Sequence, residues 1–338
     1  PKGGYWHAVG DSGTLKTWTA FCLFAEAARN PHFKDYRFVY DNAENGALMD
    51  VERFFGPAVL PRLRQPRTGQ AGSALVQEFY YHVELNVRRG PCIYVLDSMD
   101  ALQDLADDEQ FEAQLRVYDT GKGKGDVKGN MGMGKAKSNS RNIARIANQT
   151  LRENGSILVV ISQTRDRLNS HIPGQKTYSG GHNLKFYAHV QTWTKLKGDL
   201  RRDYKGKDRE YGSLISFDVT KNRVSGWHGK TPPVTFLAGY GVDDVGTSVA
   251  YLIDERHWKK PGAAAPEAKC RRAFSDGDDE DGGGKAVHAP EFDYTGDAEG
   301  LVAKIQAEGR EAELAALVGR VWAEIAAAVT PPRKPRYE

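Results

Sequence analysis

The segment from Gly10 to Thr17 has the residue types and spacing of a phosphate-binding loop. It reads Gly-Asp-Ser-Gly-Thr-Leu-Lys-Thr and matches the pattern G-x-x-x-x-G-K-[ST], except that Leu15 occupies the position of the last glycine. Such a loop curls backbone N–H groups around phosphate oxygens, while the lysine binds the outer phosphates and the hydroxyl binds Mg²⁺. The predicted nucleotide-binding residues are Gly10, Asp11, Ser12, Gly13, Thr14, Leu15, Lys16 and Thr17.

Acidic residues that follow two predicted strands could complete a site for nucleotide hydrolysis. Asp97 closes the apolar run 92–96, and its carboxylate would hold Mg²⁺ opposite Thr17, although a helix cap is the alternative role. Glu44 is the first candidate for orienting and activating the attacking water, and Asp41 is its rival. Turn formation alone would also explain either residue.

Alternating strands and helices predict the framework that positions these residues. The pattern predicts an α/β fold, with a mostly parallel twisted sheet and helices on both faces. Ligands bind such sheets at the carboxyl ends of the strands, where Gly10, Glu44, Asp97 and Gln163 all fall. This convergence is the main argument from the residues for a nucleotide site. Strands are expected at 5–9, 37–40, 92–96 and 156–161, and helices at 17–29, around 47–54, at 73–88 and at 138–153.

The composition changes near residue 242, which predicts a second region. Residues 1–241, with further strands near 188–196, 213–220 and 233–238, are expected to form the core. A small α-rich C-terminal region is expected at 242–338. It contains a helix near 245–256, an acidic, Gly-rich linker at 261–289 and helices within 297–329.

Two polar segments carry clustered cations and glycines that suit the phosphates and bases of a single nucleic-acid strand. Residues 119–137 are rich in Gly and Lys and predict a flexible loop, for which a solvated linker is the alternative. The segment 164–181 adds Ile172 and Tyr178 as stacking or wedge residues. The predicted DNA-binding residues are Lys122, Lys124, Lys128, Lys135, Lys137, Arg141, Arg165, Arg167, His171, Ile172, Lys176, Tyr178, Gly180 and Gly181.

The overall composition excludes few classes of protein. The chain has 338 residues, of which 40% are hydrophobic and 27% charged, with a formal net charge of only +3. No apolar run approaches the roughly 20 residues of a membrane span, and no signal peptide precedes the first strand. The three cysteines are scattered, which favours a reducing, cytoplasmic compartment.

Residues 161–190 and 219–223 resemble signatures of the RecA recombinases. Gly180-Gly-His-Asn-Leu-Lys-Phe-Tyr-Ala-His-Val190 is similar to the G-G-x-x-L-K-F-Y-A-x-V signature that follows the second DNA-binding loop of that family. The segment from Ile161 to Arg165 resembles the strand and N-Q-x-R segment that precede this loop. Val219-Thr-Lys-Asn-Arg223 resembles V-K-N-K of RecA, and more closely K-S-R of the phage-type UvsX recombinases. UvsX also has a bulky apolar residue where this chain has Leu15.

The resemblance covers roughly residues 5–255 and implies a RecA-like P-loop ATPase core. It implies ATP and Mg²⁺ at residues 10–17, with Asp97 as the metal-binding acid and Glu44 as the catalytic base. An extra residue separates Asp41 from Glu44 relative to the family pattern D-x-E. It further implies that Gln163 senses the γ-phosphate and that Lys221 and Arg223 reach a neighbouring subunit's ATP. The implied DNA loops are 119–141 and 164–181.

The implied activity is ATP-dependent strand exchange. A helical filament would form on single-stranded DNA and pair it with a homologous duplex, with mediator and single-strand-binding proteins as further partners and no membrane. The N-terminal segment that joins RecA subunits is expected to be absent or to lie before residue 1. Alternatives are a RecA-fold helicase or translocase, or a DNA-binding regulatory protein with impaired ATPase activity.

Overall fold

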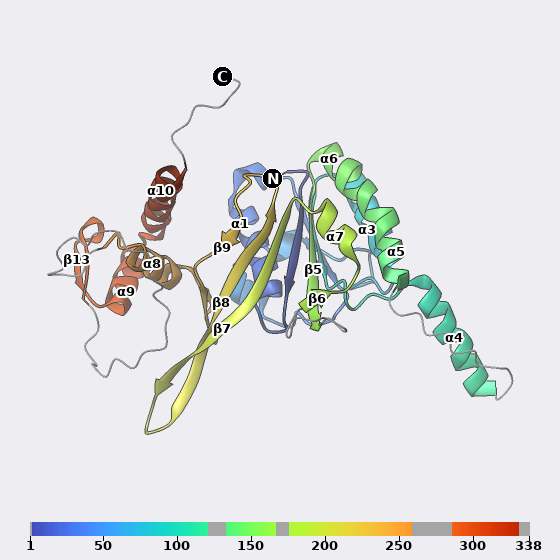
Figure 1. The fold of residues 1–338 in the computed structure, drawn as a ribbon, viewed down its shortest axis with the longest axis horizontal. Helices are drawn as coiled ribbons and strands as arrows, with labels where there is room; N and C mark the ends of the chain where they lie inside the picture. The colour runs from blue at the N-terminus through green and yellow to red at the C-terminus, as the bar shows by residue number, and fades with distance from the viewer. Residues whose placement is uncertain (1, 121–132, 167–175, 259–285, 331–338) are drawn as a thin grey trace, which may run out of the picture. The chain divides into compact units, whose positions relative to one another are not determined.

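A computed structural model describes residues 2–120, 133–166, 176–258 and 286–330. The chain divides into two compact units, Pro1–Thr231 and Pro232–Glu338. The predicted boundary after residue 241 stays a prediction. Figure 1 shows the helices and strands of both units.

The first unit is built on a mixed, mostly parallel sheet. Strand β1 (Tyr5–Gly10) lies between β5 (Ile157–Asp166) and β7 (Val190–Asp203), and β4 (Cys92–Asp97), β2 (Arg37–Asn42) and β3 (Leu63–Arg64) follow beyond β5. These strands are parallel, whereas β8 (Asp208–Asn222) runs antiparallel to β7. Short strands β6 (Lys176–Tyr178) and β9 (Gly229–Lys230) pair with β5 and β8.

Strand β4 shows why this sheet is covered on both faces. Cys92, Tyr94 and Leu96 belong to one buried cluster, whereas the alternate residues Ile93 and Val95 belong to another. Because successive side chains of a strand point to opposite faces, each face of β4 packs against its own layer of helices. Helices α3 (Val76–Arg88), α5 (Met133–Arg145) and α6 (Leu151–Asn154) contribute to the first cluster, and α1 (Lys16–Arg29) contributes to the second. The predicted α/β fold is therefore confirmed.

The strand register brings the predicted functional strand ends to one edge. Gly10 is aligned with Gln163 of β5 and with Thr194 of β7, and Asn42 of β2 is aligned with Asp97 of β4. The residues that follow these strands therefore surround the start of α1.

Helix α5 begins earlier than the sequence pattern predicts. The loop was expected to reach residue 137, but residues 133–137 are already helical and residues 105–120 form α4 (Leu105–Thr120). Lys135 donates to the Asp100 carbonyl and Ser138 donates to the Asp104 carboxylate, so polar anchors replace the apolar periodicity that the prediction relied on. A π-helical turn, η3 (Ile146–Thr150), interrupts the segment before α6, and Gly155 ends it with a φ of 77°.

The second unit is a small helical assembly. Apolar residues of α8 (Asp244–Asp254), α9 (Ala298–Glu308) and α10 (Glu311–Val329) form its core with Trp258 and Phe292. Gly309 separates the last two helices in a left-handed conformation. The hairpins are β10 (Val234–Leu237) with β11 (Gly241–Asp243), and β12 (Val287–Ala289) with β13 (Tyr294–Gly296). The remaining short elements of the chain are α2 (Val51–Phe55), α7 (His182–Tyr187), η1 (Pro31–Phe33), η2 (Leu60–Arg62) and η4 (Pro290–Phe292).

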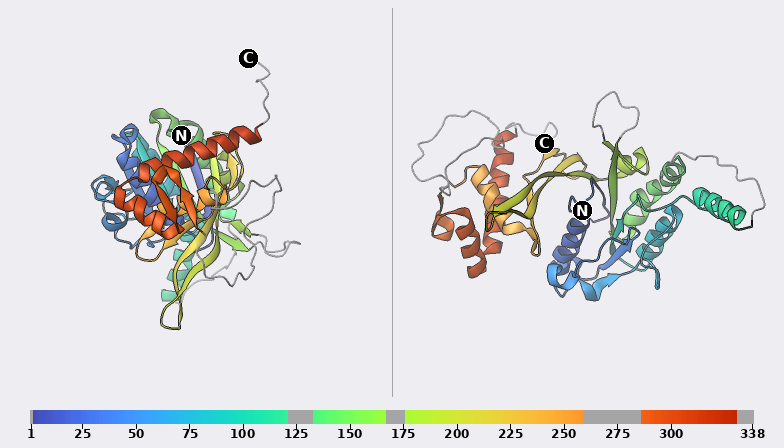
Figure 2. Two further views of the ribbon diagram at one scale, coloured as in Figure 1. Left: turned by 90° about the vertical axis from the view of Figure 1, so that its left-hand side faces the viewer. Right: turned by 90° about the horizontal axis from the view of Figure 1, so that it is seen from below.

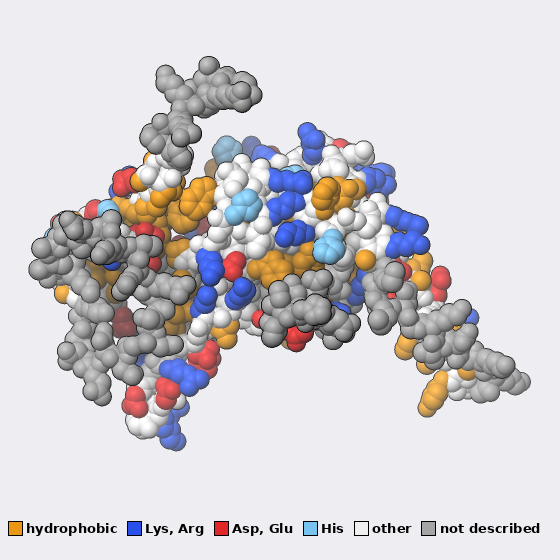
Figure 3. All heavy atoms as spheres, viewed as in Figure 1, with side chains coloured by type: hydrophobic (Ala, Val, Ile, Leu, Met, Phe, Trp, Pro, Cys, Tyr) orange, Lys and Arg blue, Asp and Glu red, His pale blue; other side chains and the backbone are white. Residues whose placement is uncertain are grey.

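The β7–β8 hairpin extends beyond the rest of its sheet (Figures 1 and 2). Basic and acidic side chains are interspersed along it (Figure 3), and several pair, as Arg201 does with Asp208 at 3.2 Å. In the described part of the chain, no helix is long and apolar enough to cross a bilayer.

Candidate active site

The segment Gly10–Thr17 forms a turn between β1 and α1, and Leu15 occupies its last non-helical position. Leu15 has a φ of 62° and a ψ of 14°, which is the left-handed region that side chains rarely adopt and glycine adopts freely. The backbone at this position therefore has the conformation that accounts for the glycine of the phosphate-loop pattern, although the residue in this chain is leucine. The Leu15 side chain is buried, with 7% of its surface exposed.

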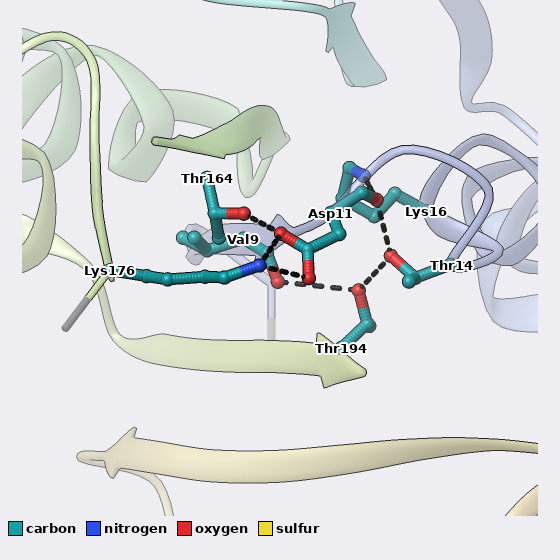
Figure 4. A network of polar contacts seen from close by, with 7 residues as sticks. All are labelled: Val9, Asp11, Thr14, Lys16, Thr164, Lys176 and Thr194. Atoms are coloured by element: carbon teal, nitrogen blue, oxygen red, sulfur yellow. Dashed lines mark hydrogen bonds and ion pairs between the residues drawn. The ribbon is translucent and has the colours of Figure 1, made fainter. Parts of the chain in front are cut away.

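Gly10 lies where the loop approaches β7 most closely. A Cβ atom at this position would overlap the Thr194 hydroxyl and would lie 2.9 Å from the Thr194 carbonyl oxygen. The Thr14 and Thr194 hydroxyls are 2.6 Å apart, and the Thr14 hydroxyl also donates to the Asp11 carbonyl at 2.7 Å (Figure 4). These contacts fix the loop against β7.

The Lys16 side chain folds back over the loop. Its Nζ donates to the Asp11 carbonyl oxygen at 2.5 Å, and the residue is buried. Burial lowers the pKa of Lys16, although the nearby carboxylates of Asp97 and Glu44 act in the opposite direction. An ammonium group at the start of a helix, where the first backbone N–H groups have no partner within the helix, is suited to bind phosphate oxygens.

Thr17 and Asp97 form the oxygen-rich part of the site. The Thr17 hydroxyl donates to Asp97 Oδ2 at 2.6 Å, and the Tyr40 hydroxyl donates to the same oxygen at 2.8 Å. Burial raises the pKa of Asp97, while these two hydrogen bonds lower it. A hydroxyl and a buried carboxylate are ligands that suit Mg²⁺, so the residues present fit this ion. Among the described residues, no group of three or more His, Cys, Asp or Glu side chains could hold a metal by itself.

Glu44 and its rival Asp41 have different surroundings. The exposed Glu44 carboxylate accepts a hydrogen bond from Gln163 Nε2, and the Glu44 N–H donates to the Asp97 carbonyl at 2.9 Å. The Asp41 carboxylate is fully buried and accepts from the Ser73 N–H at 2.6 Å and from the Tyr94 hydroxyl at 2.6 Å. Asp41 therefore satisfies buried donors, whereas Glu44 lies beside the phosphate loop and Gln163.

The ends of β5 and β6 carry cations that contact acids near the phosphate loop. Lys176 Nζ lies 2.6 Å from both carboxylate oxygens of Asp11, and the Thr164 hydroxyl donates to the same carboxylate (Figure 4). Arg165 pairs with Asp100 at 3.2 Å, and Asp100 also accepts from the Gln163 N–H at 2.6 Å.

Gly180 and Gly181 lie between β6 and α7, where the chain packs against α5. Their φ values are 95° and 84°, and Cβ atoms on them would lie 2.7 Å from Leu184 Cδ1 and 2.9 Å from Ala136 Cβ. Asn139 of α5 donates to the Gly180 carbonyl at 3.0 Å. These glycines thus permit close packing of α7 on α5.

Tyr178 was predicted to stack on bases, but its ring is half-buried. It packs edge-on against the buried His7, with 4.8 Å between ring centroids, because β6 folds back over β5. Lys137 and Arg141 are exposed on α5. Lys122, Lys124, Lys128, Arg167, His171 and Ile172 lie outside the described residues.

Lys221 and Arg223 lie away from the phosphate loop of their own chain. Lys221 Nζ donates to the Lys185 and Phe186 carbonyls at 2.6 and 2.5 Å, and Arg223 donates to the Phe186 carbonyl at 2.9 Å. The Arg223 N–H also bonds to His189, whose N–H bonds to Tyr5 at the start of β1. The strand rises about 16 Å from Tyr5 to Gly10, so these cations lie at the opposite edge of the sheet.

Sequence reasoning missed Tyr40, Asp100, Asn139 and Thr194. Each becomes important through a contact with a residue far away in the chain, such as Thr194 with Thr14. Of these four residues, only Tyr40 could have been found from the sequence. It lies near the carboxyl end of a predicted strand, and that end is expected at the site.

Comparison with known proteins identifies distant relatives, while no family model matches the chain. The protein RecA of Chlorobaculum tepidum is 26% identical over 282 residues, which cover 78% of this chain and 67% of that protein. The protein RecA of Nostoc punctiforme is 27% identical over 239 residues, covering 67% of this chain and 55% of its own length. RecA of Trichodesmium erythraeum is 26% identical over 281 residues, with coverage of 78% and 65%. The chain thus matches between about half and two thirds of these relatives.

Proposed function

This chain is a distant homologue of RecA, and on that premise we propose that it is a DNA-dependent ATPase with strand-exchange activity. ATP would bind at Gly10–Thr17, and the protein would form a filament on single-stranded DNA that pairs with a homologous duplex. The observation that carries the proposal is the convergence of the phosphate loop, the Thr17–Asp97 contact and the Glu44–Gln163 contact at one edge of the sheet.

The side chains have separate roles in the proposed reaction. Lys16 leaves the Asp11 carbonyl to bind phosphate oxygens, and Glu44 orients a water and accepts its proton. When bound to Thr17 and Asp97, Mg²⁺ would neutralise charge on the phosphates. Gln163 is proposed to report on the outer phosphate, and the support is that its side chain contacts Glu44 and its backbone N–H contacts Asp100.

The cations Lys221 and Arg223 are proposed to act on the ATP of a neighbouring copy. The support is their register, which separates them from Gly10 of their own chain by the length of β1. Burial and the neighbouring cations Arg223 and Lys185 lower the pKa of Lys221 to about 8. A neighbour's phosphate would raise the pKa of Lys221 again and would be stabilised by the positive charge of this side chain.

The proposed DNA contacts are the exposed cations on the stems of the two loops. Lys137 and Arg141 project from α5, and Arg165 and Lys176 lie at the ends of β5 and β6. Such contacts to the backbone predict binding that tolerates any sequence and weakens with salt. Assignment to the phage-type subgroup is likewise a proposal, supported by Leu15 and by the segment 219–223.

ATP turnover with and without single-stranded DNA tests the proposed function. We expect DNA to stimulate turnover, and we expect Lys16→Ala to abolish both turnover and nucleotide-dependent DNA binding. Lys34→Ala, which removes an exposed lysine outside the site, is the matched control. Electron microscopy with an ATP analogue and single-stranded DNA should show filaments. Unwinding without strand exchange would support a helicase instead, and absence of DNA-stimulated turnover would refute the proposed enzyme.

A further inference from the structure

Asp11 joins the phosphate loop to the predicted DNA-binding segment through a charged contact. Its two carboxylate oxygens each lie 2.6 Å from Lys176 Nζ, and the Thr164 hydroxyl donates to one of them (Figure 4). The partners come from different strands, since Thr164 is on β5 and Lys176 is on β6. Asp11 is therefore held by both strands of the β5–β6 pair.

The same loop residue is also held through its backbone. Lys16 Nζ donates to the Asp11 carbonyl at 2.5 Å, while Lys176 binds the Asp11 carboxylate. A phosphate group that attracts Lys16 removes one of two hydrogen bonds to this carbonyl, since the Thr14 hydroxyl donates the other at 2.7 Å. A change at the phosphate loop can thus reach Lys176 through a single residue.

We propose that Asp11 and DNA compete for Lys176. The Asp11 carboxylate pairs with this lysine, which would otherwise bind a backbone phosphate of single-stranded DNA. This inference rests on the proposed function, since it requires that the protein binds single strands. Asp11 acts as a positioning residue. It keeps Lys176 on the phosphate loop until Lys16 turns to the nucleotide.

The exposure of the pair fits a contact that ligands can break. The side chains of Lys176 and Asp11 are 41% and 42% exposed. An ion pair this accessible contributes little in water, so a phosphate group can replace it with a small change in free energy. The contact is strong enough to change affinity and too weak to prevent binding.

Asp11→Asn tests the proposal by removing the charge while keeping the size of the side chain. Without nucleotide, we expect the variant to bind an oligothymidylate strand about two- to fivefold more tightly than wild type, which is the range for an exposed ion pair. One added phosphate contact should also steepen the slope of log affinity against log salt by about 0.7. Asp11→Glu, which keeps the charge, should behave like wild type.

A second substitution separates competition from a general charge effect. Lys176→Gln should weaken binding more in the Asp11→Asn background than in wild type, because only the free lysine contacts DNA. Glu313→Gln, which changes the net charge equally by removing a partner of Arg310 on α10, should leave the salt slope unchanged. Circular dichroism checks that each variant is folded.

The possible outcomes distinguish this inference from the proposed function. If wild type binds single strands and Asp11→Asn changes neither the affinity nor the salt slope, the competition is refuted and the proposed function stands. Weaker binding by Asp11→Asn would also refute it. If no variant binds single strands, the proposed function fails and the inference fails with it.

Discussion

Leu15 offers a direct test of the backbone conformation of the phosphate loop. At an ordinary helical position, alanine is more stable than glycine by about 1 kcal/mol. At Leu15 the φ of 62° should reverse this order. We therefore expect Leu15→Gly to be at least as stable as Leu15→Ala.

The magnitude follows from three contributions to the free energy of unfolding. Both variants lose the buried leucine side chain, which contributes about 1.5–3 kcal/mol. A left-handed conformation costs a residue with a Cβ about 1–2 kcal/mol, and only glycine avoids this. Glycine loses about 0.4–1 kcal/mol more through the entropy of the unfolded chain. The free energy of unfolding of the glycine variant should thus be about 1 kcal/mol higher than that of the alanine variant. Both variants should remain less stable than wild type.

Urea unfolding followed by tryptophan fluorescence and circular dichroism measures this order. The matched control is Glu26, an exposed position inside α1. There the Glu26→Ala variant should be more stable than the Glu26→Gly variant by about 1 kcal/mol. If alanine is the more stable residue at both positions, Leu15 does not adopt the left-handed conformation in solution, and the reasoning is refuted.

Four further substitutions test the site and the buried groups around it. Glu44→Gln should lower ATP turnover about 100-fold or more. Asp41→Asn should instead lower the free energy of unfolding by about 1–3 kcal/mol, because buried donors lose their acceptor; a larger effect of Asp41→Asn on turnover would reverse the assignment. Burial lowers the pKa of His7 to about 3, so between pH 6.5 and 5 only the unfolded chain takes up its proton. Stability should fall by about 1.5–2 kcal/mol over that window as pH decreases, and urea unfolding at several pH values should show that His7→Gln removes this part of the slope. Arg223→Ala should lower turnover of assembled protein about 1,000-fold while ATP binding to the monomer is retained; loss of binding by the monomer would place Arg223 in its own site.

The sequence predicted the strand ends of the site because the physics involved is local. Apolar runs such as Cys92–Leu96 form strands, and the carboxyl ends of parallel strands share one edge. Gly10, Asp97 and Gln163 could be placed together without knowledge of any side-chain contact. The strand register in the structure agrees with this placement.

Contacts between distant residues could not be predicted in the same way. Asp11 and Lys176 are 165 residues apart in the sequence, and the fold of β6 over β5 brings them together. Tyr178 is predicted to be a stacking or wedge residue, and its contact with the His7 ring depends on the same fold of β6. The choice between Asp41 and Glu44 likewise depended on which carboxylate meets Ser73 and Tyr94.

The positions of the two cation-bearing ends of the sheet also constrain how copies could assemble. The phosphate loop follows the carboxyl end of β1, whereas Lys221 and Arg223 align with its amino end. If these cations act on a neighbour's ATP, the contact joins one edge of a subunit to the opposite edge of the next. When such a contact repeats in one direction it is heterologous, and it generates a ring if the rotation closes and an open helix if it does not. The strand register of β1, β7 and β8 therefore supports the proposal that Arg223 acts across a contact between copies.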